Sequence, residues 1–270
     1  MKRITSLKLD GFVSSMWVIE SEADLAHIPD EYTTIGAGSN VIINPKTPNT
    51  LIKVSPDFVP ITLDQDSVTC SAGASVSQLL KWMSSNNRSA LEFAAGVPAS
   101  IGGMVAMNFE CWGIEISTIV ESLLVYTKEN GLQWLSKSDY KTGYRWTSFH
   151  ETNAIILAVK LKTIEADNQT VKDEIKKNLD YRKRQQPLLK STCGSVFKNP
   201  LPQKAGQLIE GSGLKGHKQG GIQVSQHHSN FFENIESATY DDIISLIKTV
   251  QKEVLTRYNV TLSCEVKIIR

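Results

Sequence analysis

Residues 94–108, AAGVPASIGGMVAMN, are the stretch that decides the fold of this chain. Pro98 restricts a backbone torsion, and Gly102 and Gly103 lack the side chains that would keep a ligand away from the backbone. Small residues fill most of the other positions. The pattern predicts a loop that a phosphate can approach closely, and the alternative is a buried crossover packed on small residues.

A shorter glycine segment precedes it at residues 33–44, TTIGAGSNVIIN. Its two glycines let backbone N–H groups approach a phosphate, and Ser39 and Asn40 add side-chain donors. It is not a GxGxxG fingerprint, because Val41 takes the sixth position and a β-branched run follows instead of a helix. An ordinary β-turn explains this loop alone as well as a ligand cradle does. Two such loops in one half of the chain, however, suggest a long, phosphate-bearing ligand.

The surrounding sequence is rich in short β-segments, expected at residues 51–63, 67–74, 119–136 and 153–164. The dipeptide Asn130-Gly131 predicts a type I′ hairpin within the third of them. One helix interrupts this half, at residues 75–85. Its apolar residues follow the spacing of a single buried helical stripe, namely Val76, Leu79, Leu80 and Met83.

The last third of the chain contains more helix. A polar segment at residues 165–187 predicts a helix that ends before Pro187, with a solvated basic face formed by Lys176, Lys177, Arg182, Lys183 and Arg184. A second helix is expected from an N-cap at Thr239, with Asp242 completing a capping box, to about Asn259. Its buried stripe is predicted as Ile243, Ile247, Val250, Val254 and Tyr258. Residues 260–269 alternate as a strand, which puts Glu265 on the polar face. Strands first and helices later favour an α+β fold.

Composition excludes several classes of protein. With 29 Lys+Arg against 28 Asp+Glu, the net charge of +1 does not indicate a nucleic-acid or membrane partner. The four cysteines are scattered, as in a reduced cytoplasmic protein. The first residues, MKRITSLKLDGFVSSMW, contain no apolar run of signal-peptide length, and no segment is long enough to span a membrane.

A third group of residues carries reactive side chains: Arg145, the segment 191–200 (STCGSVFKNP) with Ser195, and Glu265. An arginine can bind a carboxylate or enolate, a hydroxyl can deliver a proton, and a carboxylate can assist it. Taken singly, each has a plainer reading, as a surface cation, a turn residue and a solvated strand residue. Other chemistry is poorly supported. Ser195 does not lie in a GxSxG elbow, so a hydrolase triad is not expected. The adjacent His227 and His228 would point to opposite faces of a strand, so no metal site is expected.

Cys193 is a further candidate nucleophile, although no sequence feature indicates a lowered thiol pKa.

Seven segments in register resemble the UDP-N-acetylenolpyruvoylglucosamine reductase family from about Thr33 to the C-terminus. IGAGSN resembles its first flavin loop, and GVPASIGGMVAMN resembles GIPGxxGGAxxxN. YRWTSF is similar to YRxSxF, and GSVFKNP to GSxFKNP. The other three are AGQLIEGSGLKG, GGIQVSQHHSNFFEN and the terminal EVKII. The chain reads NFECWG at residues 108–113 where the family usually has NAGAYG, and the spacing between Arg145 and Ser195 matches the shorter subclass.

The resemblance implies an α+β fold with a two-lobed FAD-binding region of the vanillyl-alcohol-oxidase (PCMH) type, over residues 1–50 and 51–165. A C-terminal α+β substrate domain would follow over residues 166–270. It implies that NADPH reduces FAD and that the flavin then reduces UDP-N-acetylglucosamine enolpyruvate to UDP-N-acetylmuramate for peptidoglycan synthesis, in a cytoplasmic enzyme. A monomer is expected because no exposed apolar stripe stands out in the sequence. An FAD oxidase or dehydrogenase with another substrate, and an inactive binding module, are the alternatives.

The same resemblance implies residue roles. Ser195 would donate the proton to C2, while Arg145 and Glu265 would stabilise the enolate-like intermediate. Asn199 and Arg182 are expected to bind the UDP portion. The residues expected to bind the cofactor are Gly36, Ala37, Gly38, Ser39, Asn40, Gly73, Ala95, Gly96, Val97, Pro98, Ser100, Ile101, Gly102, Gly103, Asn108 and Gly113.

Overall fold

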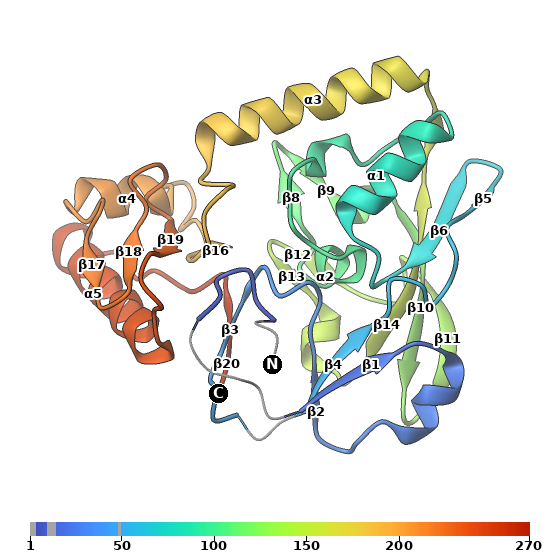
Figure 1. Cartoon of the computed structure of the whole chain (residues 1–270), viewed down its shortest axis with the longest axis horizontal. Coiled ribbons are helices and arrows are strands. Elements are labelled where there is room, and N and C mark those ends of the chain that lie inside the picture. The colour runs from blue at the N-terminus through green and yellow to red at the C-terminus, as the bar shows by residue number, and fades with distance from the viewer. Residues whose placement is uncertain (1–3, 10–14, 48–49) are drawn as a thin grey trace. The chain divides into compact units, whose positions relative to one another are not determined.

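The computed structural model describes residues 4–9, 15–47 and 50–270. The chain divides into two compact units (Figure 1). Unit 1 comprises Met1–Ser14, Gly38–Pro48 and Arg182–Arg270, and unit 2 comprises Ser15–Ala37 and Asn49–Tyr181. The expected boundaries at residues 50 and 165, between two cofactor-binding lobes and a substrate-binding domain, stay a prediction. Residues 1–3 and 10–14 of the N-terminal sequence MKRITSLKLDGFVSSMW lie outside the described residues.

Unit 2 is built around an antiparallel sheet of five strands in the order β11-β10-β14-β6-β5 (Figure 1). Its central strand β14 is buried on both faces, because Ile156 and Val159 belong to the larger core whereas Ile155 and Leu157 belong to a smaller one. A strand covered on both sides reads as a continuous apolar run, as IILAV does here. The strands are β5 Thr62–Asp64, β6 Ser67–Ser71, β10 Val120–Thr127, β11 Gly131–Ser136 and β14 Ile155–Lys162.

A three-stranded parallel sheet in the order β1-β4-β2 completes the smaller core of unit 2. Helices α1 and α2 pack in the larger core. The bounds are β1 Met16–Ile19, β2 Tyr32–Thr34, β4 Thr50–Val54, α1 Val76–Ser85 and α2 Ile101–Ala106. Short pieces fill the connections: β7 Arg88–Ser89, β8 Glu110–Cys111, β9 Ile114–Glu115, β12 Thr142–Gly143, β13 Trp146–Thr147 and β15 Ile164–Glu165, with 3-10 turns at Glu22–His27, Glu92–Ala94, Ile116–Thr118 and Ser148–Glu151.

Two local predictions in unit 2 meet different outcomes. The helix at residues 75–85 is confirmed, with all four predicted stripe residues buried and a capping box at Ser75. The hairpin is present, but the type I′ turn is wrong. Thr127 pairs with Gly131, so three residues form the turn, and Gly131 itself has a φ of +67°.

Unit 1 is an α+β unit with a four-stranded antiparallel sheet in the order β16-β19-β18-β17. Helices α4 and α5 pack on it through one core, in which Phe197 and Phe232 meet edge to face at 6.1 Å. A separate parallel pair joins β20 to β3. The elements are β3 Val41–Ile43, β16 Thr192–Ser195, α4 Ala205–Gly211, β17 Lys218–Gln219, β18 Ile222–Val224, β19 Phe231–Asn234, α5 Tyr240–Tyr258 and β20 Lys267–Ile269.

Helix α5 begins and ends where the sequence predicts. Thr239 accepts a hydrogen bond from the Asp242 N–H, and Asn259 has the left-handed conformation of a C-cap. Tyr258 is wrong as a stripe residue, because it is 37% exposed. The predicted strand at residues 260–269 is shorter than expected, since only β20 is regular and Cys264 forms an isolated bridge.

Helix α3, Asn168–Gln185, confirms the predicted helix before Pro187. Its basic face is solvated at four of the five positions, namely Lys176, Lys177, Lys183 and Arg184. Arg182 departs from that expectation, because it is only 4% exposed. Of the helices in residues 4–9, 15–47 and 50–270, none has the length and hydropathy needed to cross a membrane.

Candidate active site

The first residues of the short glycine loop lie against the start of helix α2 in unit 2. A Cβ added at Gly36 would lie 2.5 Å from the Ser100 hydroxyl oxygen and 3.2 Å from the Gly103 Cα. Ser100 caps α2 by accepting the Gly103 N–H at 3.3 Å. The two glycine segments predicted to share a ligand therefore touch through residues that carry little or no side chain.

The longer glycine segment is not a loop throughout, because residues 101–106 form α2. Gly102 is buried, and a Cβ there would lie 2.6 Å from the Ala72 Cβ. Its N–H donates to the Ala72 carbonyl at 2.8 Å, and the Ile101 N–H donates to Ala74. Gly73 is equally tight, since an added Cβ would lie 2.1 Å from the Val54 carbonyl oxygen. The backbone at Gly73 and Gly102 is therefore packed against other residues of unit 2, and these two glycines fix the shape of the segment.

The outward-facing part of this segment is residues 96–98. Gly96 has a φ of +82° and is exposed, as is Pro98, whereas Val97 is half-buried and Ala95 is buried. A surface of backbone and small side chains like this one fits a flat, extended dinucleotide, because no long side chain stands in the way. Residues 96–98 are therefore compatible with FAD on steric grounds, whereas contact between FAD and the other predicted residues stays a prediction.

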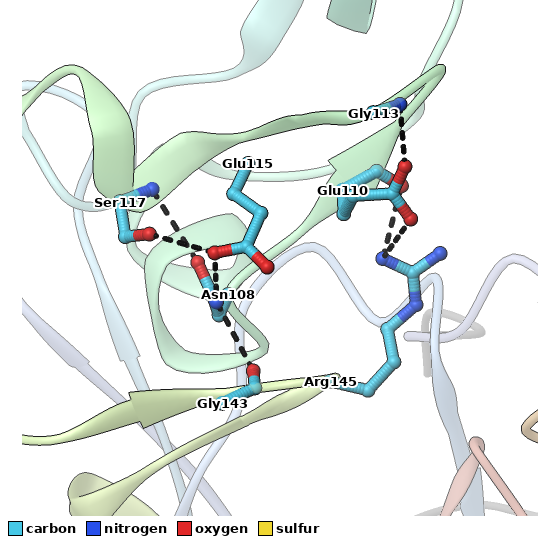
Figure 2. Close-up of polar contacts among 7 residues, drawn as sticks. All are labelled: Asn108, Glu110, Gly113, Glu115, Ser117, Gly143 and Arg145. Atoms are coloured by element: carbon cyan, nitrogen blue, oxygen red, sulfur yellow. Dashed lines mark hydrogen bonds and ion pairs between the residues drawn. The ribbon is translucent and has the colours of Figure 1, made fainter.

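Asn108 sits buried at the end of the same segment with its amide fully engaged (Figure 2). Its Nδ2 donates to the Glu115 carboxylate at 2.9 Å and to the Gly143 carbonyl at 3.0 Å, and its Oδ1 accepts the Ser117 N–H at 3.4 Å. The Gly143 bond fixes the strand end that leads to Arg145. The structure thus gives Asn108 an internal anchoring role, whereas its contact with the cofactor stays a prediction.

Arg145 takes a left-handed backbone conformation, with a φ of +55°, and its side chain is 15% exposed. Its Nη1 donates to the Glu110 carbonyl at 2.9 Å and lies 4.0 Å from the Glu110 carboxylate (Figure 2). The guanidinium carbon also lies 5.7 Å from the Phe109 ring centre and 5.4 Å from that of Tyr144. A strained backbone and a guanidinium held on several sides suit a positioned functional group better than a surface cation.

The remaining residues of the first loop belong to unit 1. Gly38 has a φ of +77°, and an added Cβ would lie 2.3 Å from the Ile4 carbonyl oxygen. Asn40 reaches the segment of Glu265, because its Nδ2 donates to the Glu265 carbonyl at 3.3 Å and its own carbonyl accepts the Lys267 N–H at 3.0 Å. Gly113, also predicted near the flavin, lies in unit 2, where its N–H donates to the Glu110 carboxylate.

Ser195 and Glu265 lie on neighbouring segments of unit 1. Ser195 ends β16 directly after Gly194, which has a φ of +74°. The next residue, Val196, accepts hydrogen bonds from the Glu265 N–H at 2.8 Å and the Val266 N–H at 3.3 Å. Both Ser195 and Glu265 are partly buried. The structure therefore brings together two of the three predicted catalytic residues within one unit, while Arg145 belongs to unit 2.

Two predicted substrate ligands have partners within the protein. The Asn199 side chain accepts the Ala205 N–H at 3.0 Å, at the start of α4. Arg182 contacts Gln186 at 3.4 Å. Their role in binding UDP stays a prediction.

Two residues in these surroundings escaped the sequence prediction. Asn230 is 4% exposed, and its side chain bonds both the N–H and the carbonyl of Phe197, close to Ser195. The second is Glu110. Asn230 stands in a largely polar segment, SQHHSNFFEN, and carried no sequence signal, whereas for Glu110 the signal was the NFECWG departure itself.

The cysteine alternative has no support in the structure. Cys193 is fully buried, and burial raises the pKa of its thiol to about 12. A thiol held protonated cannot serve as a nucleophile near neutral pH. In the part of the chain that the structure describes, no group of three metal-ligating side chains comes together.

Comparison with known proteins first gives the class. Residues 23–136 match an FAD-binding domain, so this is a flavin-dependent protein with the vanillyl-alcohol-oxidase (PCMH) type of FAD region within an α+β fold, as the sequence predicts. Residues 186–269 match the C-terminal domain of UDP-N-acetylenolpyruvoylglucosamine reductase.

Similar whole proteins give the family. The chain is 36% identical to a UDP-N-acetylenolpyruvoylglucosamine reductase of Bacillus pumilus, over 88% of this chain and 79% of that one. It is 34% identical to one of Bacillus velezensis, over 98% and 90%. The crystal structure of the Thermus caldophilus enzyme, 27% identical, superimposes with a TM-score of 0.87 over 99% of this chain and 96% of that one. The chain belongs to the UDP-N-acetylenolpyruvoylglucosamine reductase family, an FAD- and NADPH-dependent group of oxidoreductases in peptidoglycan synthesis, and the oxidase alternative is not favoured.

Proposed function

We propose that this chain reduces UDP-N-acetylglucosamine enolpyruvate to UDP-N-acetylmuramate with electrons from NADPH, and that Arg145, Ser195 and Glu265 carry the chemistry. The observation that supports the proposal most directly is the pair of hydrogen bonds that joins the Glu265 segment to Val196, beside Ser195. Hydroxyl and carboxyl side chains from distant parts of the sequence are thereby held on adjacent backbone segments.

Arg145 is proposed to bind the carboxylate of the enolpyruvyl group. Negative charge grows on that carboxylate as the double bond is reduced, so a fixed guanidinium binds the transition state more tightly than the substrate. The contacts to the Glu110 carbonyl and the two aromatic rings hold the guanidinium in place before the substrate arrives. Such preorganisation avoids reorganisation during the reaction.

Ser195 is proposed to deliver the proton to C2 of the enolpyruvyl group. A serine hydroxyl is a weak acid, so it needs a hydrogen-bonded neighbour to replace the proton it gives up. Glu265 is proposed to assist the proton transfer and to stabilise, with Arg145, the enolate-like intermediate. Asn199 and Arg182 are proposed to bind the UDP portion.

FAD, when bound, supplies the hydride that reaches C3 of the substrate. The residues proposed to hold it are those of the two glycine segments, where Gly36, Gly96 and Pro98 offer backbone and small side chains. The lobes over residues 1–50 and 51–165 would bind the cofactor, and residues 166–270 the substrate.

The test is made in one anaerobic cuvette with the FAD-loaded protein. NADPH should bleach the flavin absorbance, and UDP-N-acetylglucosamine enolpyruvate should restore it. Ser195→Ala should bleach normally and recover more slowly by several orders of magnitude. Recovery at the wild-type rate in Ser195→Ala would remove Ser195 from the reaction. Recovery in the wild type only with oxygen would instead contradict the proposed substrate.

Glu265→Gln should likewise slow recovery while leaving bleaching intact. Arg145→Ala should in addition require a higher concentration of the enolpyruvyl substrate, because it removes the carboxylate ligand. An Arg145→Ala variant with unchanged kinetics would contradict its role. Replacing Arg145 with Lys provides the conservative comparison, since lysine keeps the charge but loses the planar fork.

We also propose that the protein is cytoplasmic and works as a monomer. Its four free thiols suit a reducing compartment. Met16, Trp17 and Val18 are consecutive exposed residues on β1, at the edge of its sheet, and an exposed apolar edge of this kind favours association. Light scattering across a range of protein concentrations tests the monomer proposal, and a mass that doubles with concentration would overturn it.

A further inference from the structure

Glu110 contacts the guanidinium of Arg145 through two different groups (Figure 2). Its backbone carbonyl accepts a hydrogen bond from Nη1 at 2.9 Å, and its carboxylate Oε2 lies 4.0 Å from the same nitrogen. The other carboxylate oxygen accepts the Gly113 N–H at 2.7 Å, across the turn of the β8–β9 hairpin. The bond from Gly113 therefore fixes the rotamer of Glu110 and holds its carboxylate beside Arg145.

The two charges interact in a partly dry environment. The Arg145 side chain is 15% exposed and that of Glu110 is 29% exposed. Charges shielded from water to this degree are screened less by solvent and salt than those of an exposed ion pair. A second carboxylate that approaches Arg145 would therefore meet repulsion from Glu110 as well as attraction to the guanidinium.

The place of Arg145 does not depend on the Glu110 carboxylate alone. The Glu110 carbonyl bond is made by the backbone and survives any side-chain substitution. Asn108 holds the Gly143 carbonyl, two residues before Arg145, and the rings of Phe109 and Tyr144 lie beside the guanidinium. Removal of the carboxylate charge should leave the arginine where it is and change mainly the electrostatic field around it.

We propose that the Glu110 carboxylate competes with the substrate and product carboxylates for Arg145 and thereby sets the affinity for carboxylate ligands. The inference rests on the proposed role of Arg145 as the carboxylate ligand. In the family pattern NAGAYG the third residue is glycine, whereas this chain has Glu110 there. Weaker binding of the product would speed its release, at the cost of a higher KM for the substrate.

The decisive experiment compares two ligands that differ in the carboxylate. UDP-N-acetylmuramate carries the lactyl carboxylate, and UDP-N-acetylglucosamine lacks it. Their dissociation constants are measured on the FAD-loaded protein by calorimetry, for the wild type and for Glu110→Gln. The matched control is Glu129→Gln, which removes the same charge from the exposed β10–β11 turn of the same unit.

Glu110→Gln should bind UDP-N-acetylmuramate about tenfold more tightly, which corresponds to about 1.4 kcal/mol, and UDP-N-acetylglucosamine with unchanged affinity. The gain should shrink at high salt, and KM should fall without a matching rise in kcat. Glu129→Gln should match the wild type with both ligands. Glu110→Ala, which removes the charge without leaving an amide, should repeat the tightening.

Product affinity that is unchanged or weaker in both Glu110 variants would overturn the inference and leave the proposed reaction untouched. An equal gain for both ligands would also overturn it, because a general effect of folding or packing would explain that result. A wild-type protein that fails to bind UDP-N-acetylmuramate would instead contradict the proposed function, and the inference with it.

Discussion

Gly36→Ala is predicted to destabilise the protein by a specific collision between the two glycine segments. The added Cβ would lie 2.5 Å from the Ser100 hydroxyl oxygen and 3.2 Å from the Gly103 Cα. The hydroxyl can swing away, but it then leaves the Gly103 N–H that it accepts at 3.3 Å. The Gly103 backbone has no such freedom, since it belongs to α2.

The magnitude follows from these two contacts. Loss of the Ser100 cap costs about 1 kcal/mol. Overpacking against the helix backbone adds roughly 1–3 kcal/mol. The free energy of unfolding should therefore fall by about 2–4 kcal/mol, which lowers the melting temperature by roughly 4–7 °C for a chain of this size.

A double-mutant cycle on the FAD-free protein tests the cause. Ser100→Ala removes the colliding hydroxyl, so Gly36→Ala should cost about 1 kcal/mol less in that background. Gly143→Ala is the matched control, because its added Cβ meets nothing closer than the Trp146 ring at 3.5 Å. Strictly additive costs for Gly36→Ala and Ser100→Ala would refute the collision as the cause, and so would an unchanged melting temperature in Gly36→Ala.

Three further outcomes are expected. Thr239→Ala should lower the free energy of unfolding by about 1 kcal/mol in urea titrations, through loss of the cap to the Asp242 N–H; an effect near zero would show that the cap is dispensable. Burial lowers the pKa of His228, so the unfolded chain takes up its proton first as the pH falls below about 6.5, and stability should drop from pH 7 to pH 5; His228→Asn should flatten that drop, and an unaltered profile would exclude His228 as its source. Cys193, whose thiol pKa is raised to about 12, should react with a thiol reagent at pH 8 only at the rate of unfolding; labelling is assigned by residue because Cys111 and Cys264 are partly exposed, and rapid labelling of Cys193 itself in the native protein would contradict its burial.

Helices α1 and α5 were readable from sequence because everything that defines them is local. The capping residues stand within three positions of one another, and the buried stripes follow a single period. Helix α2 was not readable in this way, since its two glycines disfavour a helix. It forms because Ser100 caps it and because Gly102 packs on Ala72, which lies far away in the sequence.

Strand register and contacts between distant residues could not be predicted from the local sequence pattern either. Asn130-Gly131 is compatible with more than one turn, and the pairing of Thr127 with Gly131 decides between them. The alternation around Glu265 predicted a continuous strand, but its partners are the Phe197 segment and β3, which bend the chain into a bridge and a short strand. The sequence indicated Arg145, Ser195 and Glu265 as candidates. The contact between Glu110 and Arg145 could not be predicted, because the two residues are 35 positions apart and nothing in the sequence pairs them.

The parallel pair β3–β20 has a consequence for synthesis on the ribosome. Val41 leaves the ribosome early, but its partner Lys267 emerges 226 residues later. Unit 2 needs no residue beyond Tyr181, so it can fold while the ribosome is still translating. Unit 1 cannot be completed until β20 has emerged, so residues 38–47 must wait for residues 267–269. The segment that carries Glu265 thus emerges long after Ser195, so a nascent chain cannot bring the two residues together before residue 265 has been made.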